Sequence, residues 1–148
     1  MRINKIILII IAVLLMIAAF IGCSQSEPTP EFQVPPYSGN ITEILLLAFS
    51  IGEYYAYLAA FDPSADTVMS EDWFMQTGAF VQSKVGAYIA GSKEVYEVKP
   101  KERYIDIIYK TKFTDEPADV YVTVAFSVTE NRTYAAGIWF SSPKLFGQ

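Results

Sequence analysis

The sequence contains no histidine and only one cysteine, Cys23. Histidine is the side chain that most often serves as a general base, as a transition-metal ligand and as the partner of a serine or cysteine nucleophile. A single cysteine forms neither an internal disulfide nor a thiolate zinc site. We therefore expect no metal and no cofactor, and the usual triad chemistry of hydrolases is excluded.

Positive charge is also scarce, since 11 lysines and arginines face 16 acidic residues and the net charge is −5. Nucleic-acid binding needs clustered basic side chains to neutralise phosphates, so we expect no nucleic-acid partner. The sequence also lacks a glycine-rich phosphate loop, a nucleophile elbow and any metal-ligand spacing. These absences favour a protein that is not an enzyme.

The chain begins with two basic residues, Arg2 and Lys5, followed by an unbroken apolar run from Ile6 to Ile21. A basic start, an apolar run and small residues at its end are typical of a secretory signal peptide. The run is shorter than the roughly 20 residues that span a bilayer as a helix. We interpret residues 1–22 as a signal peptide.

Cys23 directly follows this run, in the stretch Phe20–Ile21–Gly22–Cys23. The stretch resembles the lipobox of prokaryotic lipoproteins, although Phe20 stands where that motif usually has a Leu-like residue. The resemblance implies cleavage before Cys23, a lipid on its thiol, and attachment of the chain to the extracytoplasmic side of the cell membrane. The alternative is an uncleaved anchor helix.

Residues 23–39 contain four prolines, which favour extended backbone, so we interpret them as the lipidated cysteine and a proline-rich linker. Residues 40–148 form the predicted folded domain. Its first helix is expected over 40–61, with Asn40 as N-cap and Glu43 in a capping box. One face of this helix is predicted to consist of Ile44, Ala48, Ile51, Tyr55 and Leu58.

A second helix is expected over 70–85, capped by Ser70 and ended by Gly86. Alternating apolar and polar residues then predict strands over 95–100, 103–113, 119–129 and 133–142, with TDEPAD as a hairpin loop. Short loops between successive strands imply antiparallel neighbours. The predicted architecture is α+β, with two N-terminal helices packed on a four-stranded antiparallel meander sheet.

Helices followed by such a meander resemble the cystatin-like and nuclear transport factor 2-like folds. A narrower resemblance is to domains of unknown function in secreted prokaryotic, including archaeal, lipoproteins. The residues that carry it are Lys84, Val85, Gly86, Tyr88, Val122, Val124, Phe126, Gly137, Ile138, Trp139 and Phe140. These are packing residues, so the resemblance implies a fold and no activity.

Two sets of residues are candidates for a functional role. A ligand pocket between helix and sheet is predicted from Tyr55, Trp73, Tyr88, Asp106 and Trp139. The sequons Asn40-Ile-Thr42 and Asn131-Arg-Thr133 are candidate N-glycosylation sites. Core filling explains the aromatic residues equally well, and capping or turn positions explain the asparagines.

Three functions are compatible with this sequence. The first is a membrane-anchored, non-enzymatic module that binds a small apolar ligand or a protein partner. The second is a structural envelope protein that forms a homodimer through the open face of its sheet, where Tyr121, Thr123 and Ser127 lie. The third is an enzyme that uses carboxylates and tyrosines, with Asp106 as its leading residue.

Overall fold

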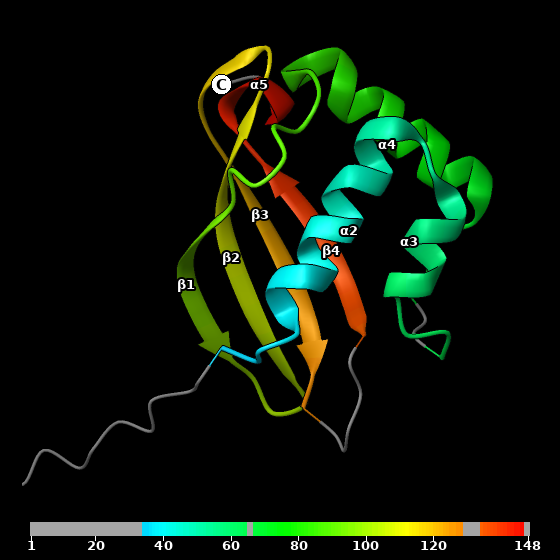
Figure 1. The fold of residues 1–148 in the computed structure, drawn as a ribbon, viewed down its shortest axis with the longest axis vertical. Coiled ribbons are helices and arrows are strands. Elements are labelled where there is room, and N and C mark those ends of the chain that lie inside the picture. The colour runs from blue at the N-terminus through cyan, green and yellow to red at the C-terminus, as the bar shows by residue number, and fades with distance from the viewer. Residues whose placement is uncertain (1–33, 65–66, 129–133, 147–148) are drawn as a thin grey trace, which may run out of the picture. The chain divides into compact units, whose positions relative to one another are not determined.

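The computed structural model describes residues 34–64, 67–128 and 134–146 (Figure 1). The predicted signal peptide, Cys23 and Asn131 lie outside these residues. The first described helix begins at Ser38, before the predicted domain boundary at residue 40.

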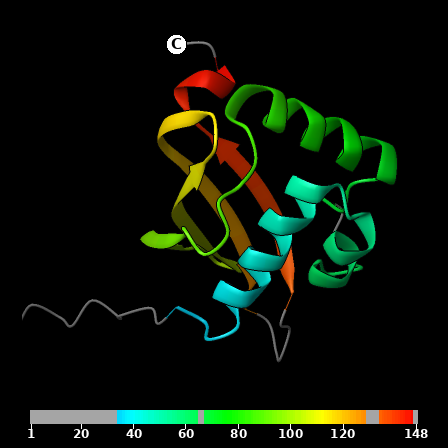
Figure 2. The same cartoon turned by 45° about the horizontal axis from the view of Figure 1, so that its top comes forward.

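The described chain is an α+β domain, as predicted, with an antiparallel sheet in the order β1-β2-β3-β4. The elements are α2 (Ser38–Ile51), α3 (Tyr54–Ala60), α4 (Glu71–Val85), β1 (Glu94–Pro100), β2 (Tyr104–Phe113), β3 (Glu116–Ser127), β4 (Ala135–Ser141) and α5 (Pro143–Phe146). Both Figure 1 and Figure 2 show α2 lying across one face of the sheet, with α3 and α4 beyond β4.

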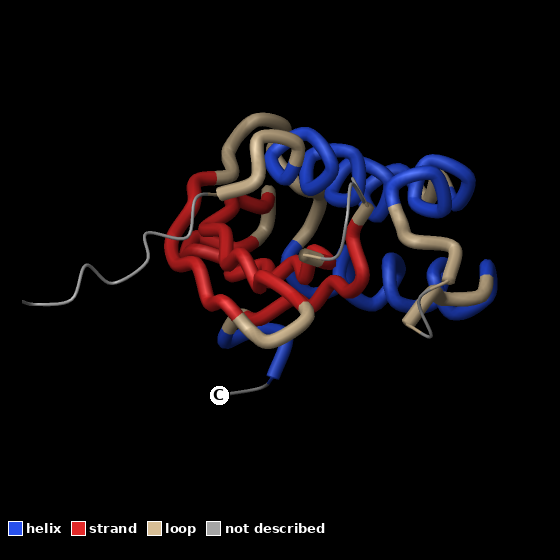
Figure 3. The backbone as a smooth tube through the Cα atoms, turned by 90° about the horizontal axis from the view of Figure 1, so that it is seen from below, coloured by secondary structure: helices blue, strands red, loops and turns tan. Residues whose placement is uncertain are grey.

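The core lies between α2 and the inner face of the sheet. Alternate residues of β2 and β3 point inward, as the sequence pattern predicts. They are fully or almost fully buried, and they are Ile105, Ile107, Tyr109, Thr111, Phe113, Val120, Val122, Val124 and Phe126. From α2 they meet Leu45, Leu46 and Phe49. Figure 3 shows the sheet with the main helices along one side, which leaves its outer face uncovered by α2, α3 and α4.

The single helix expected over 40–61 is wrong, because Gly52 divides it into α2 and α3. Gly52 has a φ of 71°, in the left-handed region that glycine adopts without steric cost, and it ends α2. The predicted apolar face is not the buried one, since Ile51 and Tyr55 are 74% and 73% exposed. Ile44 is also exposed, whereas Ala48 is buried. Residues 44–49 of α2 are all apolar, so the spacing of apolar residues did not identify the side that is buried.

The start of α2 differs from the prediction as well. Asn40 is exposed and lies inside the helix. The N-cap position is held by Tyr37, whose side chain makes no capping hydrogen bond. Buried Ser38 donates its hydroxyl proton to the carbonyl of Pro35 at 2.8 Å, and Tyr37 packs on Phe126. The last part of the expected linker therefore belongs to the folded unit.

The second predicted helix is confirmed as α4. The amide of Trp73 donates to the Ser70 hydroxyl at 3.4 Å, and Gly86 ends the helix. The hairpin loop is shorter than expected, because β3 already begins at Glu116.

Candidate functional site

The five residues of the predicted pocket lie in three different environments. Tyr55 on α3 and Trp73 on α4 are largely exposed and line neither of the two cavities described below. Tyr88 is buried on the helix side of the sheet, whereas Asp106 and Trp139 share a cavity on the outer face. The structure therefore brings together only two of the five.

Tyr88 belongs to a polar network centred on Glu43 of α2. Its hydroxyl donates to Glu43 Oε2 at 3.0 Å, while the amide of Gly91 donates to Oε1 at 2.8 Å and Lys93 forms an ion pair at 2.5 Å. Burial, together with its position as donor to a carboxylate, raises the pKa of Tyr88 to about 12. Tyr88 therefore connects the segment before β1 to α2 rather than lining a pocket.

The outer cavity has a volume of about 300 Å³ and lies against β2, β3 and β4. Its lining residues are Ser64, Thr67, Lys101, Tyr104, Asp106, Ala125, Ala136 and Trp139. Asp106 is only 7% exposed and is paired with the ammonium of Lys101. Sequence reasoning placed Asp106 and Trp139 among the candidates but did not foresee the loop residues Ser64 and Thr67, which come from beyond α3.

A second cavity, of about 320 Å³, lies along β4 between α4 and α5, and we call it the β4 groove. Its lining is almost entirely apolar and consists of Met69, Thr77, Phe80, Val81, Ile138, Trp139, Phe140, Leu145 and Phe146. Phe80 and Phe146 are 51% and 67% exposed, so the groove opens to solvent. Sequence analysis missed this site, because one wall is a helix of four residues that carries no periodicity signal.

β4 is an edge strand of the sheet. Its first two residues are covered. The amide of Asp62 donates to the carbonyl of Ala135 at 2.8 Å, and the hydroxyl of Thr67 donates to the carbonyl of Ala136. Within the described ranges, no strand is paired with the outer edge of residues 137–141. The β4 groove lies beside this uncovered part of the edge.

The two sequons differ in what the structure shows of them. Asn40 is exposed on the first turns of α2, but Thr42 of the same sequon is fully buried. Asn131 falls outside the described residues.

The described part of the chain has no group of three or more acidic or cysteine side chains that could hold a metal ion. No helix in the same residues is long and apolar enough to cross a membrane. Comparisons with known protein families, curated proteins and solved structures find no match to this chain.

Proposed function

We propose that this chain is a lipid-anchored, extracytoplasmic binding module without enzymatic activity. Its α+β domain binds an extended, apolar segment of a partner protein in the β4 groove. The observation that carries this proposal is the position of the groove, which runs beside an uncovered strand edge.

The groove supplies apolar surface for a side chain of the partner. Its walls hold Phe80 from α4, Ile138 and Phe140 from β4, and Leu145 from α5. Burying apolar area contributes about 25 cal/mol per Å², so one large side chain in this groove provides a useful part of the binding free energy. Clustered aromatic residues that remain exposed are a feature of interaction sites.

The strand edge supplies backbone hydrogen-bonding groups. An extended segment that pairs with an exposed edge satisfies its own amides and carbonyls, and alternate side chains enter neighbouring pockets. Ala135 and Ala136 already accept hydrogen bonds from residues outside the sheet, through Asp62 and Thr67. A partner strand paired with residues 137–141 would extend this row of hydrogen bonds along the edge of β4.

The form of the groove favours a peptide over a small apolar molecule. Sites for small ligands bury most of the ligand surface inside a concave cavity. Here Phe80, Trp139 and Phe146 are each at least half exposed, so the groove is open along one side. An extended chain that lies along β4 would cover these three side chains together.

The membrane anchor rests on the sequence. The lipobox-like stretch that ends in Cys23 and the proline-rich segment after it fit a mature chain tethered to the outer side of the cell membrane. We also propose that the domain is of the cystatin-like or nuclear transport factor 2-like kind, because its helices precede an antiparallel meander.

The peptide site is tested by selecting random seven-residue peptides on phage against the full chain in detergent micelles. Enriched peptides are expected to share a large apolar residue within an alternating pattern. They should bind the Tyr55→Asp variant, whose substitution lies outside the groove, and lose binding to Phe80→Asp. Amide NMR signals of residues 137–141 should shift on binding. No enrichment, or equal binding to Phe80→Asp, would overturn the proposal.

The anchor is tested by mass spectrometry of the chain extracted from its own membranes. A mass that begins at a lipid-bearing Cys23 is expected, and Cys23→Ser should release the chain from the membrane fraction or leave the signal uncleaved. A full-length, unmodified chain would contradict the lipid anchor and favour a permanent N-terminal helix.

A further inference from the structure

Trp139 lies across Gly137 on the outer face of the sheet. A Cβ atom added to Gly137 would stand 2.2 Å from Cη2 of the Trp139 indole, 2.8 Å from Cζ3 and 3.0 Å from Cζ2. The six-membered ring therefore covers the space that any other residue at position 137 would fill. Residues two apart in a strand share a face, so both belong to the outer surface.

A glycine in the middle of a strand lowers stability, and the contact with Trp139 explains why position 137 nevertheless holds one. Glycine within a strand loses conformational entropy and offers no side chain for packing. Gly137 is buried in the middle of β4, whereas Trp139 is 52% exposed. The indole thus has one side against the backbone of β4, about half of the residue remains exposed, and its side chain lines both the outer cavity and the β4 groove.

Polar groups line the same cavity. The carboxylate of Asp106 is held by Lys101, and Tyr104 is 41% exposed at the rim. Hydroxyl-bearing Ser64 and Thr67 form the side beyond β4. Asp106 is mostly buried although it carries a charge, which is unusual for a residue on an otherwise open sheet face.

These features together restrict the chemistry of a ligand. The ion pair of Asp106 and Lys101 leaves the described lining without net charge, so a phosphate or another strongly charged group gains little there. A purely apolar ligand would desolvate this ion pair without replacing its hydrogen bonds to water, which is costly. A sugar ring has C–H groups on one face that pack on an aromatic ring, and hydroxyls around its edge that pair with carboxylate, ammonium and phenol groups.

We propose that the outer cavity is a saccharide-binding site, in which a pyranose ring packs on Trp139 and hydrogen-bonds to Asp106 and Lys101. This site shares Trp139 with the peptide site, but its polar residues, Asp106 and Lys101, do not line the β4 groove. It gives the domain a second ligand class, a neutral glycan. Because Trp139 is shared, Asp106 and Phe80 are the residues that separate the two proposals.

The test uses saturation-transfer NMR on the full chain in a detergent that has no sugar headgroup. The probes are the methyl glycosides of glucose, galactose, mannose and N-acetylglucosamine. At least one probe should receive saturation, strongest at the protons of one ring face, and should change the fluorescence of Trp139 in a Trp73→Phe background. The absence of saturation transfer to all four probes would overturn the proposal.

Variants then locate the site. Asp106→Asn should weaken the best probe by about tenfold or more, since a hydrogen bond to a charged group is typically worth 1.5–3 kcal/mol. Trp139→Ala should abolish binding. Asp119→Asn is the matched control, because Asp119 is also ion-paired, with Lys112 at 2.6 Å. Phe80→Asp should leave sugar binding unchanged even where it removes peptide binding.

Thermal unfolding distinguishes loss of the site from loss of the fold. Each variant should keep a cooperative transition. If Asp106→Asn stays folded and binds the sugar as tightly as the unmodified chain, the assignment of the site is wrong.

Discussion

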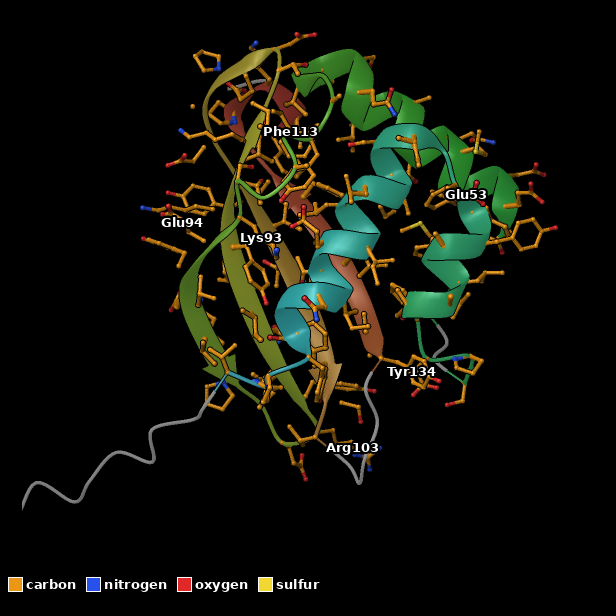
Figure 4. All side chains as sticks on the ribbon, viewed as in Figure 1. Glu53, Lys93, Glu94, Arg103, Phe113 and Tyr134 are labelled. Carbon is orange, nitrogen blue, oxygen red and sulfur yellow. The ribbon has the colours of Figure 1, made fainter. Side chains whose placement is uncertain are left out.

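Glu43 on α2 and Lys93, just before β1, form an ion pair of 2.5 Å that joins residues 50 positions apart in the chain. Their side chains are 22% and 19% exposed, so solvent screens this pair less than an ion pair at the surface. Tyr88 and Gly91 donate to the same carboxylate. The network holds the segment between α4 and β1 against α2. Lys93 is labelled in Figure 4.

Replacing Glu43 by glutamine should destabilise the fold. Glu43→Gln keeps the shape of the side chain and one acceptor oxygen but removes the charge that three donors share. Hydrogen bonds to charged groups contribute about 1.5–3 kcal/mol each, against about 0.5–1.5 kcal/mol for bonds between neutral groups. We expect a loss of about 1–3 kcal/mol in the free energy of unfolding, measured with urea at pH 7. Glu53→Gln, at an exposed glutamate labelled in Figure 4, is the control and should change stability by less than about 0.5 kcal/mol. Equal effects would show that the network adds no stability.

The same network makes stability depend on pH. Burial of the Glu43 carboxyl acts to raise its pKa, but hydrogen bonds from Lys93, Gly91 and Tyr88 together outweigh burial and lower the pKa. A lowered folded-state pKa adds stability that is present above the unfolded value, about 4.3 for glutamate, and is lost as the pH falls through the folded value. The difference between the unmodified chain and Glu43→Gln should therefore shrink below about pH 4. A difference that stays constant from pH 7 to pH 3 would contradict this assignment.

The two central strands, β2 and β3, were predictable because both follow one simple rule. Their inward apolar residues alternate with outward residues that are mostly polar, a pattern that follows from burial of one face. The N-cap Ser70 and the terminal Gly86 of α4 were predictable too, since both act through local backbone geometry. Each of these features depends on residues close together in the sequence.

Features that depend on distant residues were not predictable. Glu43 fits a capping box, but its carboxylate is used by Tyr88 and Lys93, 45 and 50 positions further along the chain. The β4 groove forms only where α4, β4 and α5 come together. The four residues of α5 (Pro143–Phe146) are too few to show a periodic pattern that would predict one of its walls. For the outer cavity, the sequence offered Asp106 and Trp139 as candidates, but only the register of the sheet and the position of Thr67 place them together.

The division between α2 and α3 gives a third prediction. Gly52 has a left-handed backbone with a φ of 71°, and a Cβ there would lie 3.4 Å from the Met75 side chain. The backbone conformation is therefore the main cost of Gly52→Ala, and we expect a loss of about 1–2 kcal/mol in unfolding free energy. Gly39→Ala is the matched control, because Gly39 lies within α2 with open space around it. It should be neutral or stabilising by up to about 1 kcal/mol. A stabilising Gly52→Ala would mean that α2 and α3 join into one helix without cost.

Two buried threonines give the last prediction. Thr42 and Thr111 are both fully buried, but only the Thr111 hydroxyl has a partner in the described residues, the carbonyl of Val120 at 2.6 Å. A buried hydroxyl without a partner costs desolvation free energy, so Thr42→Val should stabilise the domain or leave it unchanged. Thr111→Val removes the hydrogen bond to the carbonyl of Val120, and it should lower the free energy of unfolding by about 1–3 kcal/mol.

Valine has nearly the same shape as threonine, so packing changes little at either site, and urea unfolding of the two variants compares the hydroxyls directly. A clear loss on Thr42→Val would show that its hydroxyl has a partner, such as a buried water, and the sequon Asn40-Ile-Thr42 would then have a structural reason for its threonine.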